Sequence, residues 1–147
     1  MPRRTTHEES SCPVARPLDV VGDGWTLLIV RDAFDGLSRF GQFQKNLGLA
    51  KNILSARLAG LVAGGVFETA PASDGSPYQE YVLTEKGRAL FPVVTALRQW
   101  GEQYFFESDE PRARLVDRVD GAPIAPIEVR AADGRMLGPD DAEVLLP

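Results

Sequence analysis

The sequence has little of the chemistry that disulfides, metal sites and membrane spans require. Its 147 residues include one cysteine, Cys12, and one histidine, His7, so an internal disulfide is excluded. Residues 107–147 contain neither residue type, which excludes the usual structural zinc site there. No apolar run approaches the roughly 20 residues that span a bilayer, and residues 1–12 lack the apolar core of a secretory signal. We therefore expect a cytoplasmic protein without a metal, a cofactor or a membrane segment.

Acidic residues are also missing from one long stretch of a chain whose formal net charge is -5. Residues 107–147 hold five Arg against ten Asp and Glu, whereas residues 1–106 hold 11 cations and 11 carboxylates. Residues 36–67, here called the acid-free stretch, contain no carboxylate and four cations. A surface that faces phosphates must lack carboxylates, whereas a merely solvated surface mixes both signs. The acid-free stretch therefore predicts a local face for a polyanion.

The acid-free stretch has the periodicity of two helices joined by a glycine turn. The first is expected at 39–47, capped by Ser38 and ended by Gly48. The second is expected at about 50–63 and is stopped by Gly64. Their apolar stripes are Phe40, Phe43 and Leu47 in the first helix, and Leu54, Leu58, Leu61 and Val62 in the second. Two amphipathic helices with a short turn predict a helix-turn-helix.

The flanking segments predict a wing and further helices. A short helix is expected from Pro13 to the turn at 22–24, followed by a helix over 25–34. Residues 66–70 and 81–84 are expected as strands around the loop 71–80. A hairpin directly after a helix-turn-helix is a wing.

The C-terminal half predicts a long helical region, followed by a segment whose residues alternate in polarity. The helical region is expected from Thr84 to about 106, kinked or divided at Pro92. Residues 127–137 alternate in polarity around a turn at 133–134 and predict a small β-hairpin. We therefore expect the chain to have three parts: a mobile leader at 1–11, a winged-helix domain at 12–106, and an acidic β extension at 107–147.

Residues on the outer side of the second helix predict how DNA would be read. Asn52 and Ser55 near its beginning can reach base edges, and the small Ala56 lets the helix lie deep in a major groove. Cations around them suit phosphates, which fix register rather than sequence. The predicted DNA contacts are Arg39, Gln42, Lys45, Lys51, Asn52, Ser55, Ala56, Arg57, Tyr78 and Gln79.

Two parts of this predicted surface are ambiguous from the sequence. Arg57 lies closer to the buried side of its helix, so an internal ion pair and a phosphate contact both stay open. The wing contains Asp74 and Glu80 but no Lys or Arg. Minor-groove contact by the wing is correspondingly weak, with Tyr78 and Gln79 as its useful polar side chains.

Specific residues along 12–104 resemble the HxlR family of winged-helix transcriptional regulators, relatives of the MarR group. The matching residues, in family order and spacing, are Trp25-Thr26, Arg39-Phe40, Leu54-Ser55, Arg57-Leu58, Tyr81, Leu83-Thr84, Gly87, Pro92 and Trp100. The resemblance implies an α+β winged helix-turn-helix with dimerisation helices, here followed by the small C-terminal β-hairpin extension. It also implies a homodimer on the first and last helices that binds an inverted repeat in double-stranded DNA. Ala50 departs from the family, which often has Ser there as a cap.

Cys12 precedes Pro13 at the expected start of the first helix, with Arg16 one turn further on. A helix N-terminus and a nearby cation both favour a thiolate. The family resemblance adds that members sensing oxidants or electrophiles use a cysteine at this location. Two interpretations stay open: redox sensing through Cys12, or a capped thiol without a role.

An effector pocket is the second regulatory hypothesis, and core or dimer packing is the alternative for its aromatic residues. The residues concerned are Trp25, Phe34, Trp100 and Tyr104. No enzyme motif is convincing, so we expect a regulator rather than an enzyme, with an oxidant or small-molecule effector. The rival functions are a winged-helix module that binds a protein partner instead of DNA, and a small-molecule carrier or enzyme.

Overall fold

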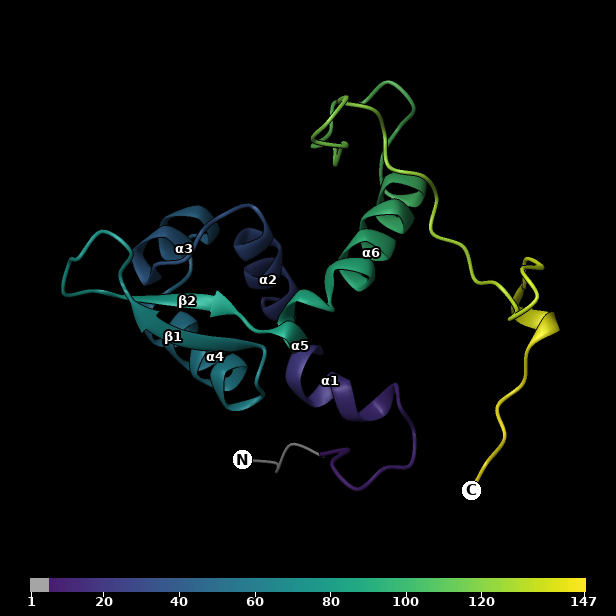
Figure 1. Ribbon diagram of the computed structural model, residues 1–147, viewed down its shortest axis with the longest axis horizontal. Helices are drawn as coiled ribbons and strands as arrows, with labels where there is room; N and C mark the ends of the chain where they lie inside the picture. The colour runs from purple at the N-terminus through teal and green to yellow at the C-terminus, as the bar shows by residue number, and fades with distance from the viewer. Residues whose placement is uncertain (1–5) are drawn as a thin grey trace. The chain divides into compact units, whose positions relative to one another are not determined.

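The computed structural model describes residues 6–147, and the chain divides into two compact units, one ending at Phe91 and one beginning at Pro92. The elements of the first unit are α1 (Ala15–Val21), α2 (Thr26–Phe34), α3 (Phe40–Leu47), α4 (Lys51–Ala63), β1 (Phe67–Pro71), β2 (Gln79–Leu83) and α5 (Glu85–Arg88) (Figure 1). α6 (Phe91–Tyr104) starts at the division, and the second unit also contains a 3-10 helix, Pro139–Asp141. The α+β class and the winged helix-turn-helix are confirmed.

The core of the first unit joins the helix-turn-helix to the hairpin. Leu54, Leu58 and Leu61 of α4 are buried, as the predicted stripe requires, and Phe43 of α3 is fully buried. The Phe43 and Phe67 rings lie 6.2 Å apart between centroids. Burying these large apolar side chains fixes the helix-turn-helix against the hairpin, because each contributes roughly 1.5–3 kcal/mol when removed from water.

β1 and β2 pair as an antiparallel hairpin with Phe67 opposite Leu83 and Pro71 opposite Gln79. We call this hairpin and its loop, residues 67–83, the wing. Both strands extend further toward the loop than the sequence predicted, so the loop is 72–78 rather than 71–80. The Tyr81 N–H also donates to the Ser38 carbonyl at 2.7 Å, which ties the wing to the segment before α3. In Figure 1 the wing loop projects from one end of the hairpin, and α5 follows the other end.

Two expected helix starts are wrong in detail. α1 begins at Ala15, with Val14 as its N-cap, rather than at Pro13. Ser38 does not cap α3, because the first helical residue is Phe40 and Arg39 occupies the cap position. The side-chain oxygen of Gln42 instead accepts from the backbone N–H groups of Ser38 and Arg39, at 2.9 and 3.0 Å. Gln42 thereby satisfies two N–H groups next to the helix start from inside the first turn.

Two further expectations concern α4 and the break before α6. Val62 was expected in the buried stripe of α4, but its exposed fraction is 36%, while its neighbour Leu61 is buried. Adjacent helical residues point about 100° apart, so both cannot face the same core. The expected division near Pro92 is confirmed: α5 ends at Arg88, and Pro92 lies in the first turn of α6, where a missing N–H has no consequence.

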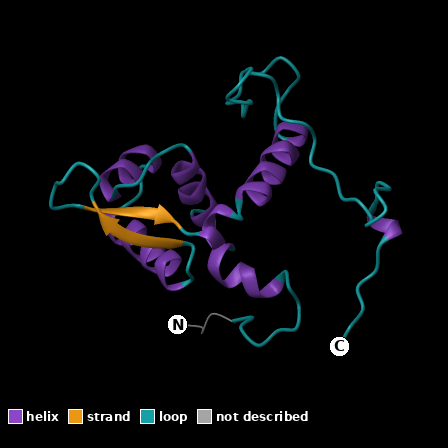
Figure 2. Ribbon diagram, in the orientation of Figure 1, coloured by secondary structure: helices purple, strands orange, loops and turns teal. Residues whose placement is uncertain are grey.

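The expected hairpin in the extension is reduced to a turn with an isolated bridge. Arg130 and Met136 form the bridge, and Gly134 between them has a φ of +92°, which favours glycine. A second bridge joins Val116 and Pro123. Figure 2 accordingly shows the only strands of the described chain in the wing, and the extension after α6 as loop apart from one short helix.

Part of the predicted leader, residues 1–5, lies outside the described residues. The following residues contact α1: the His7 N–H donates to Asp19 Oδ2 at 2.8 Å, and Arg16 Nε donates to the Ser10 carbonyl at 2.5 Å. The predicted domain boundary at residue 106 stays a prediction. No helix within 6–147 is long and apolar enough to cross a membrane.

Candidate nucleic-acid interface

A tight glycine turn sets the angle between α3 and α4. Gly48 ends α3 with a φ of +65°, a conformation that costs glycine little and other residues more. Its N–H donates to the Gln44 carbonyl at 2.9 Å, and the next residue, Leu49, is buried. The chain then enters α4 at Ala50, whose side chain offers no cap. The replacement of the family's common Ser by Ala50 therefore leaves the first turn of α4 without a side-chain cap.

The outer face of α4 is exposed, carries small side chains near the start of the helix, and contains no carboxylate. Lys51, Asn52, Ser55 and Ala56 are all exposed, and no carboxylate occurs in α3 or α4. The structure therefore brings four of the predicted DNA contacts onto one helix face. Such a face can approach a duplex without carboxylate–phosphate repulsion.

A groove of about 710 Å³ runs between the start of α3 and the wing. Its lining residues are Arg39, Phe40, Gly41, Gln42, Pro77, Tyr78, Gln79 and Tyr81. Four of the predicted DNA contacts, from two segments more than 30 residues apart in sequence, thus meet in one groove. Gln42 already uses its side-chain oxygen at the start of α3, so its amide N–H groups are what it can offer a ligand.

Arg39 is paired with the two carboxylates of the wing. Its Nη2 lies 2.5 Å from Asp74 Oδ2 and 3.7 Å from Glu80 Oε1. The hydrogen bond to Asp74 is the main reason why the pKa of Arg39 is raised. The backbone N–H of Ser76, followed by the Arg39 guanidinium, lowers the pKa of Asp74 to about 2. The sequence places Asp74 and Glu80 in the wing, but no local pattern in it indicates that they bind Arg39.

Arg57 is also paired internally. Its Nε lies 3.2 Å from Asp23 Oδ1, without the alignment of a hydrogen bond. Burial by itself raises the pKa of Asp23, but hydrogen bonds from the Thr26 hydroxyl and from the N–H groups of Trp25 and Thr26, together with Arg57, lower it below its ordinary value. Of the two alternatives left open for Arg57, the structure contains the internal ion pair.

The remaining two cations of the acid-free stretch are unpaired. Lys45 and Lys51 are exposed, and neither forms an ion pair with any residue between 6 and 147. In this conformation they are the cations of α3 and α4 that can meet phosphates without first leaving a carboxylate.

A buried carboxylate that the sequence analysis did not single out connects α2 to α3. Asp32 is buried, lies 2.9 Å from Arg31 Nη2, and accepts from the Asn46 amide at 2.9 Å. A buried carboxylate between two polar residues is structural, because removing either partner leaves a desolvated group. The sequence contained one sign of this buried carboxylate, because Asp32 interrupts an otherwise apolar face of α2.

The candidate redox residue lies before α1 rather than at its cap. Cys12 is exposed and is a free thiol. Its carbonyl accepts from the Arg16 N–H at 3.4 Å, while the Arg16 Nε donates to Ser10. The expectation that Cys12 lies at the start of the first helix is therefore wrong, because the helix begins at Ala15 and Val14 is its N-cap.

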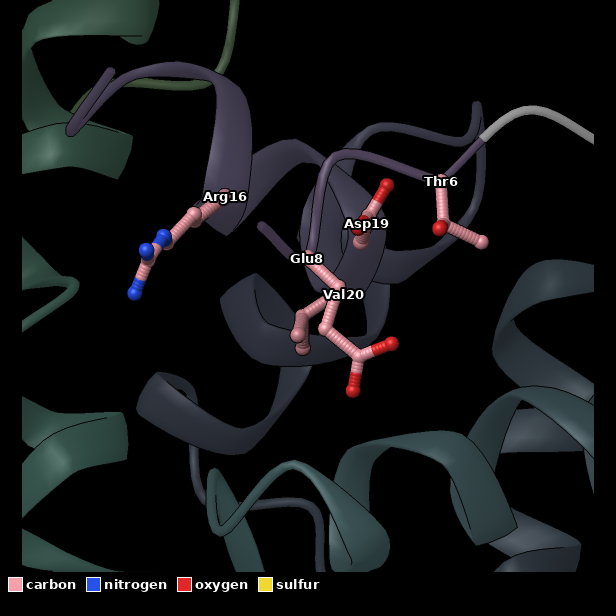
Figure 3. Close-up of a pocket in the computed structure, with 5 residues that line it drawn as sticks. All are labelled: Thr6, Glu8, Arg16, Asp19 and Val20. Carbon is pink, nitrogen blue, oxygen red and sulfur yellow. The ribbon is translucent and has the colours of Figure 1, made fainter. Parts of the chain in front are cut away.

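A hollow of about 410 Å³ lies beside α1, lined by Thr6, Glu8, Arg16, Asp19 and Val20 (Figure 3). Figure 3 shows the Arg16 side chain extending away from Glu8 and Asp19. The Arg16 cation and the Glu8 and Asp19 carboxylates do not point toward one place, so the hollow favours neither an anionic nor a cationic ligand. Among the described side chains, no group of three His, Cys, Asp or Glu residues could hold a metal ion.

The aromatic residues considered for an effector pocket are distributed over both units. Phe34 packs edge-on against Phe91 in the first unit, with centroids 5.3 Å apart. Trp100 and Tyr104 of α6 lie 6.1 Å apart in the second. Trp25 has an exposed fraction of 37%. The effector pocket stays a prediction.

Comparison with known proteins identifies the family. Residues 20–109 match the HxlR-like helix-turn-helix. The chain belongs to the HxlR family. Mb3122 of Mycobacterium bovis, an uncharacterized HTH-type transcriptional regulator, is 44% identical over 110 residues, which cover 75% of this HxlR-family chain and 70% of that protein.

Two solved structures extend the comparison. PA1607, described as a candidate transcription factor, is 62% identical with a TM-score of 0.91, over 96% of this chain and 99% of that one. The redox regulator HypR in its reduced form is 33% identical with a TM-score of 0.57, over 63% of this chain and 92% of that one. These similarities agree with the winged helix-turn-helix fold, and the names of these related proteins are those of transcriptional regulators.

Proposed function

We propose that this HxlR-family chain is a transcriptional regulator that acts in the cytoplasm as a homodimer on an inverted-repeat operator. The observation that carries the proposal is the exposed outer face of α4, which has a free Lys51 beside Asn52 and Ser55 and no carboxylate in the acid-free stretch around it. The names of related proteins as HTH-type regulators support it. An α-helix with small outward side chains fits a B-DNA major groove about 12 Å wide.

The proposed contacts divide by chemistry. Asn52 and Ser55 read base edges, and Ala56 lets the backbone of α4 approach them. Lys45 and Lys51 bind phosphates. Gln42, Tyr78 and Gln79 contact the backbone along the groove between α3 and the wing. Arg39 and Arg57 contribute to DNA binding only where they leave their internal carboxylates.

An apolar face on α6 supports the homodimer. Val93, Leu97, Trp100 and Tyr104 recur at helical spacing, and their exposed fractions lie between 48% and 65%. α1 also exposes Leu18, at 46%. Exposed apolar faces of this kind mark association surfaces, and a two-fold dimer would place two α4 helices in half-sites about 34 Å apart.

A salt titration tests DNA binding, using the duplex upstream of the protein's own coding region. If the dimer neutralises about six phosphates, log K falls against log salt with a slope near -5. Lys51→Gln is expected to weaken binding to every duplex and to flatten the slope by about 0.9 for each lost phosphate contact. Asn52→Ala is expected to cost about 1–3 kcal/mol of discrimination between operator and unrelated DNA.

The matched control is Lys86→Gln, which removes an exposed cation from α5, outside α3, α4 and the wing. It should leave the slope unchanged. Weak binding to every duplex, independent of salt and unaffected by Lys51→Gln, would contradict the proposal. That result would favour the alternative function, a winged helix that binds a protein partner, which the absence of any cation in the wing also favours.

We also propose that oxidation of Cys12 changes operator affinity. The thiol is exposed, and the similarity to the redox regulator HypR supports the proposal. With one cysteine per chain, the product is a disulfide to a second chain or to a small thiol. Mild oxidant is expected to give an adduct that Cys12→Ser abolishes, together with a shift in operator affinity. Unchanged affinity after the adduct has been verified by mass spectrometry would refute it.

A further inference from the structure

The wing of this chain has a charge opposite to that expected of a DNA-contacting hairpin. Residues 67–83 contain three carboxylates and no Lys or Arg. Two of the three, Asp74 and Glu80, bind Arg39 at the start of α3. One cation and two carboxylates leave this cluster with a net charge of -1, so the cluster as a whole repels a phosphate.

Both carboxylates are held in place by the wing itself. Asp74 Oδ1 accepts from the Ser76 N–H at 2.9 Å. Glu80 Oε1 accepts from the Ser73 N–H at 3.2 Å and from the Ser73 hydroxyl at 3.0 Å. The carboxylates are therefore presented to Arg39 in a fixed position, whereas the arginine has a long side chain that can adopt other rotamers.

Arg39 also lines the groove between α3 and the wing, together with Gln42, Tyr78 and Gln79. The exposed fraction of the Arg39 side chain is 30%, so it is accessible from solvent. A phosphate entering this groove would therefore meet Arg39 with its charge already neutralised by Asp74 and Glu80.

We propose that Asp74 and Glu80 compete with the DNA backbone for Arg39, and that this competition sets the affinity and the salt dependence of binding. The inference rests on the proposed function, since it requires that the groove faces DNA. In the free protein the wing holds Arg39. On DNA, Arg39 can bind a phosphate only by leaving both carboxylates, so in the unsubstituted chain it adds little to the binding free energy or to the salt dependence.

The competition predicts that Asp74→Asn strengthens DNA binding. The substitution keeps the size of the side chain and brings the cluster charge to zero. We expect affinity for duplex DNA to rise roughly threefold to twentyfold for the dimer, and the slope of log K against log salt to steepen by about 1.8, for two phosphates. Asp109→Asn is the matched control: it makes the same charge change at an exposed aspartate outside the wing and should leave both quantities unchanged.

A double-mutant cycle separates competition from simple repulsion. Arg39→Met alone should have a small effect, because Arg39 is already neutralised, and in the Asp74→Asn background it should abolish the gain. Circular dichroism and thermal unfolding of each variant establish that the fold is retained. A gain that persists without Arg39 would show plain repulsion and overturn the inference.

The remaining outcomes are also decisive. Unchanged or weaker binding of Asp74→Asn, with normal binding by the unsubstituted chain, overturns the inference and leaves the proposed function standing. An unsubstituted chain that binds no duplex at low salt removes the proposed function, and the inference with it.

Discussion

At the scale of single residues, Asp23 shows how one carboxylate serves two purposes. It accepts from the N–H groups of Trp25 and Thr26 at 2.8 and 2.9 Å, and so caps the first turn of α2. The same side chain is the partner of Arg57 on α4. A residue in a glycine-rich turn thereby fixes a helix start and also removes a cation from the acid-free stretch.

Asp23→Ala is expected to lower the free energy of unfolding by about 1–2 kcal/mol, the usual cost of losing an N-terminal cap. Because the pKa of Asp23 is lowered by folding, its contribution is complete above the unfolded value of 3.8 and is lost as pH falls through the folded value. Urea unfolding at pH 7 and at successively lower pH measures both effects. Asp23→Asn, which retains a side-chain oxygen as acceptor, should lose less at pH 7. Equal stability of the native chain and Asp23→Ala at pH 7 would contradict this account.

At the scale of elements, α5 packs closely against the residue before β1. At the point of closest approach, Gly87, there is no room for a side chain. A Cβ on Gly87 would lie 2.2 Å from the Val66 carbonyl oxygen and 2.9 Å from Leu83 Cδ2. The Thr84 hydroxyl accepts from the Gly87 N–H at 3.1 Å and fixes the start of α5. Gly87 is therefore required by close approach of backbone to backbone.

Gly87→Ala is expected to destabilise the fold by about 2–4 kcal/mol, because the backbone has to move to relieve the overlap. Gly101→Ala provides the contrast: nothing lies within 4 Å of the added methyl, so the higher helix propensity of alanine should stabilise α6 by up to about 1 kcal/mol. Thermal unfolding of the two variants should shift the midpoint in opposite directions. A Gly87→Ala midpoint equal to that of the native chain would refute the packing argument.

At the scale of the whole molecule, the extension at 107–147 lacks a core of its own. None of its residues is buried, and it exposes large apolar side chains such as Val129 at 65% and Leu145 at 84%. Ordering a segment costs conformational entropy that burial normally offsets. The extension is held locally, for example by the Gln99 side chain, which bonds to the Ala125 carbonyl and to the Ile127 N–H. We therefore expect its apolar side chains to pack on the second copy of the chain in the proposed homodimer.

Removal of residues 107–147 is expected to weaken the proposed homodimer at least about tenfold, the effect of losing one to two buried apolar side chains at an association surface. Sedimentation equilibrium measures the dissociation constant. Leu145→Asp should reproduce part of the loss, whereas Glu143→Gln, at an exposed position beside it, should not. A shortened chain that dimerises as tightly as the complete one would show that the extension has no part in assembly.

The sequence by itself determined the helix-turn-helix, the wing and the acid-free stretch, because periodicity, turn residues and charge along a segment are local properties. Three features could not be predicted from the sequence, because they depend on competing contacts. They are the capping of α3 by the Gln42 side chain, the exposure of Val62, and the reduction of the hairpin near Gly134 to a single bridge. Only the tertiary structure decided which cations of the acid-free stretch are free. Arg39 and Arg57 find their carboxylates more than 30 residues away along the chain, and such pairs form only where the fold brings the two segments together.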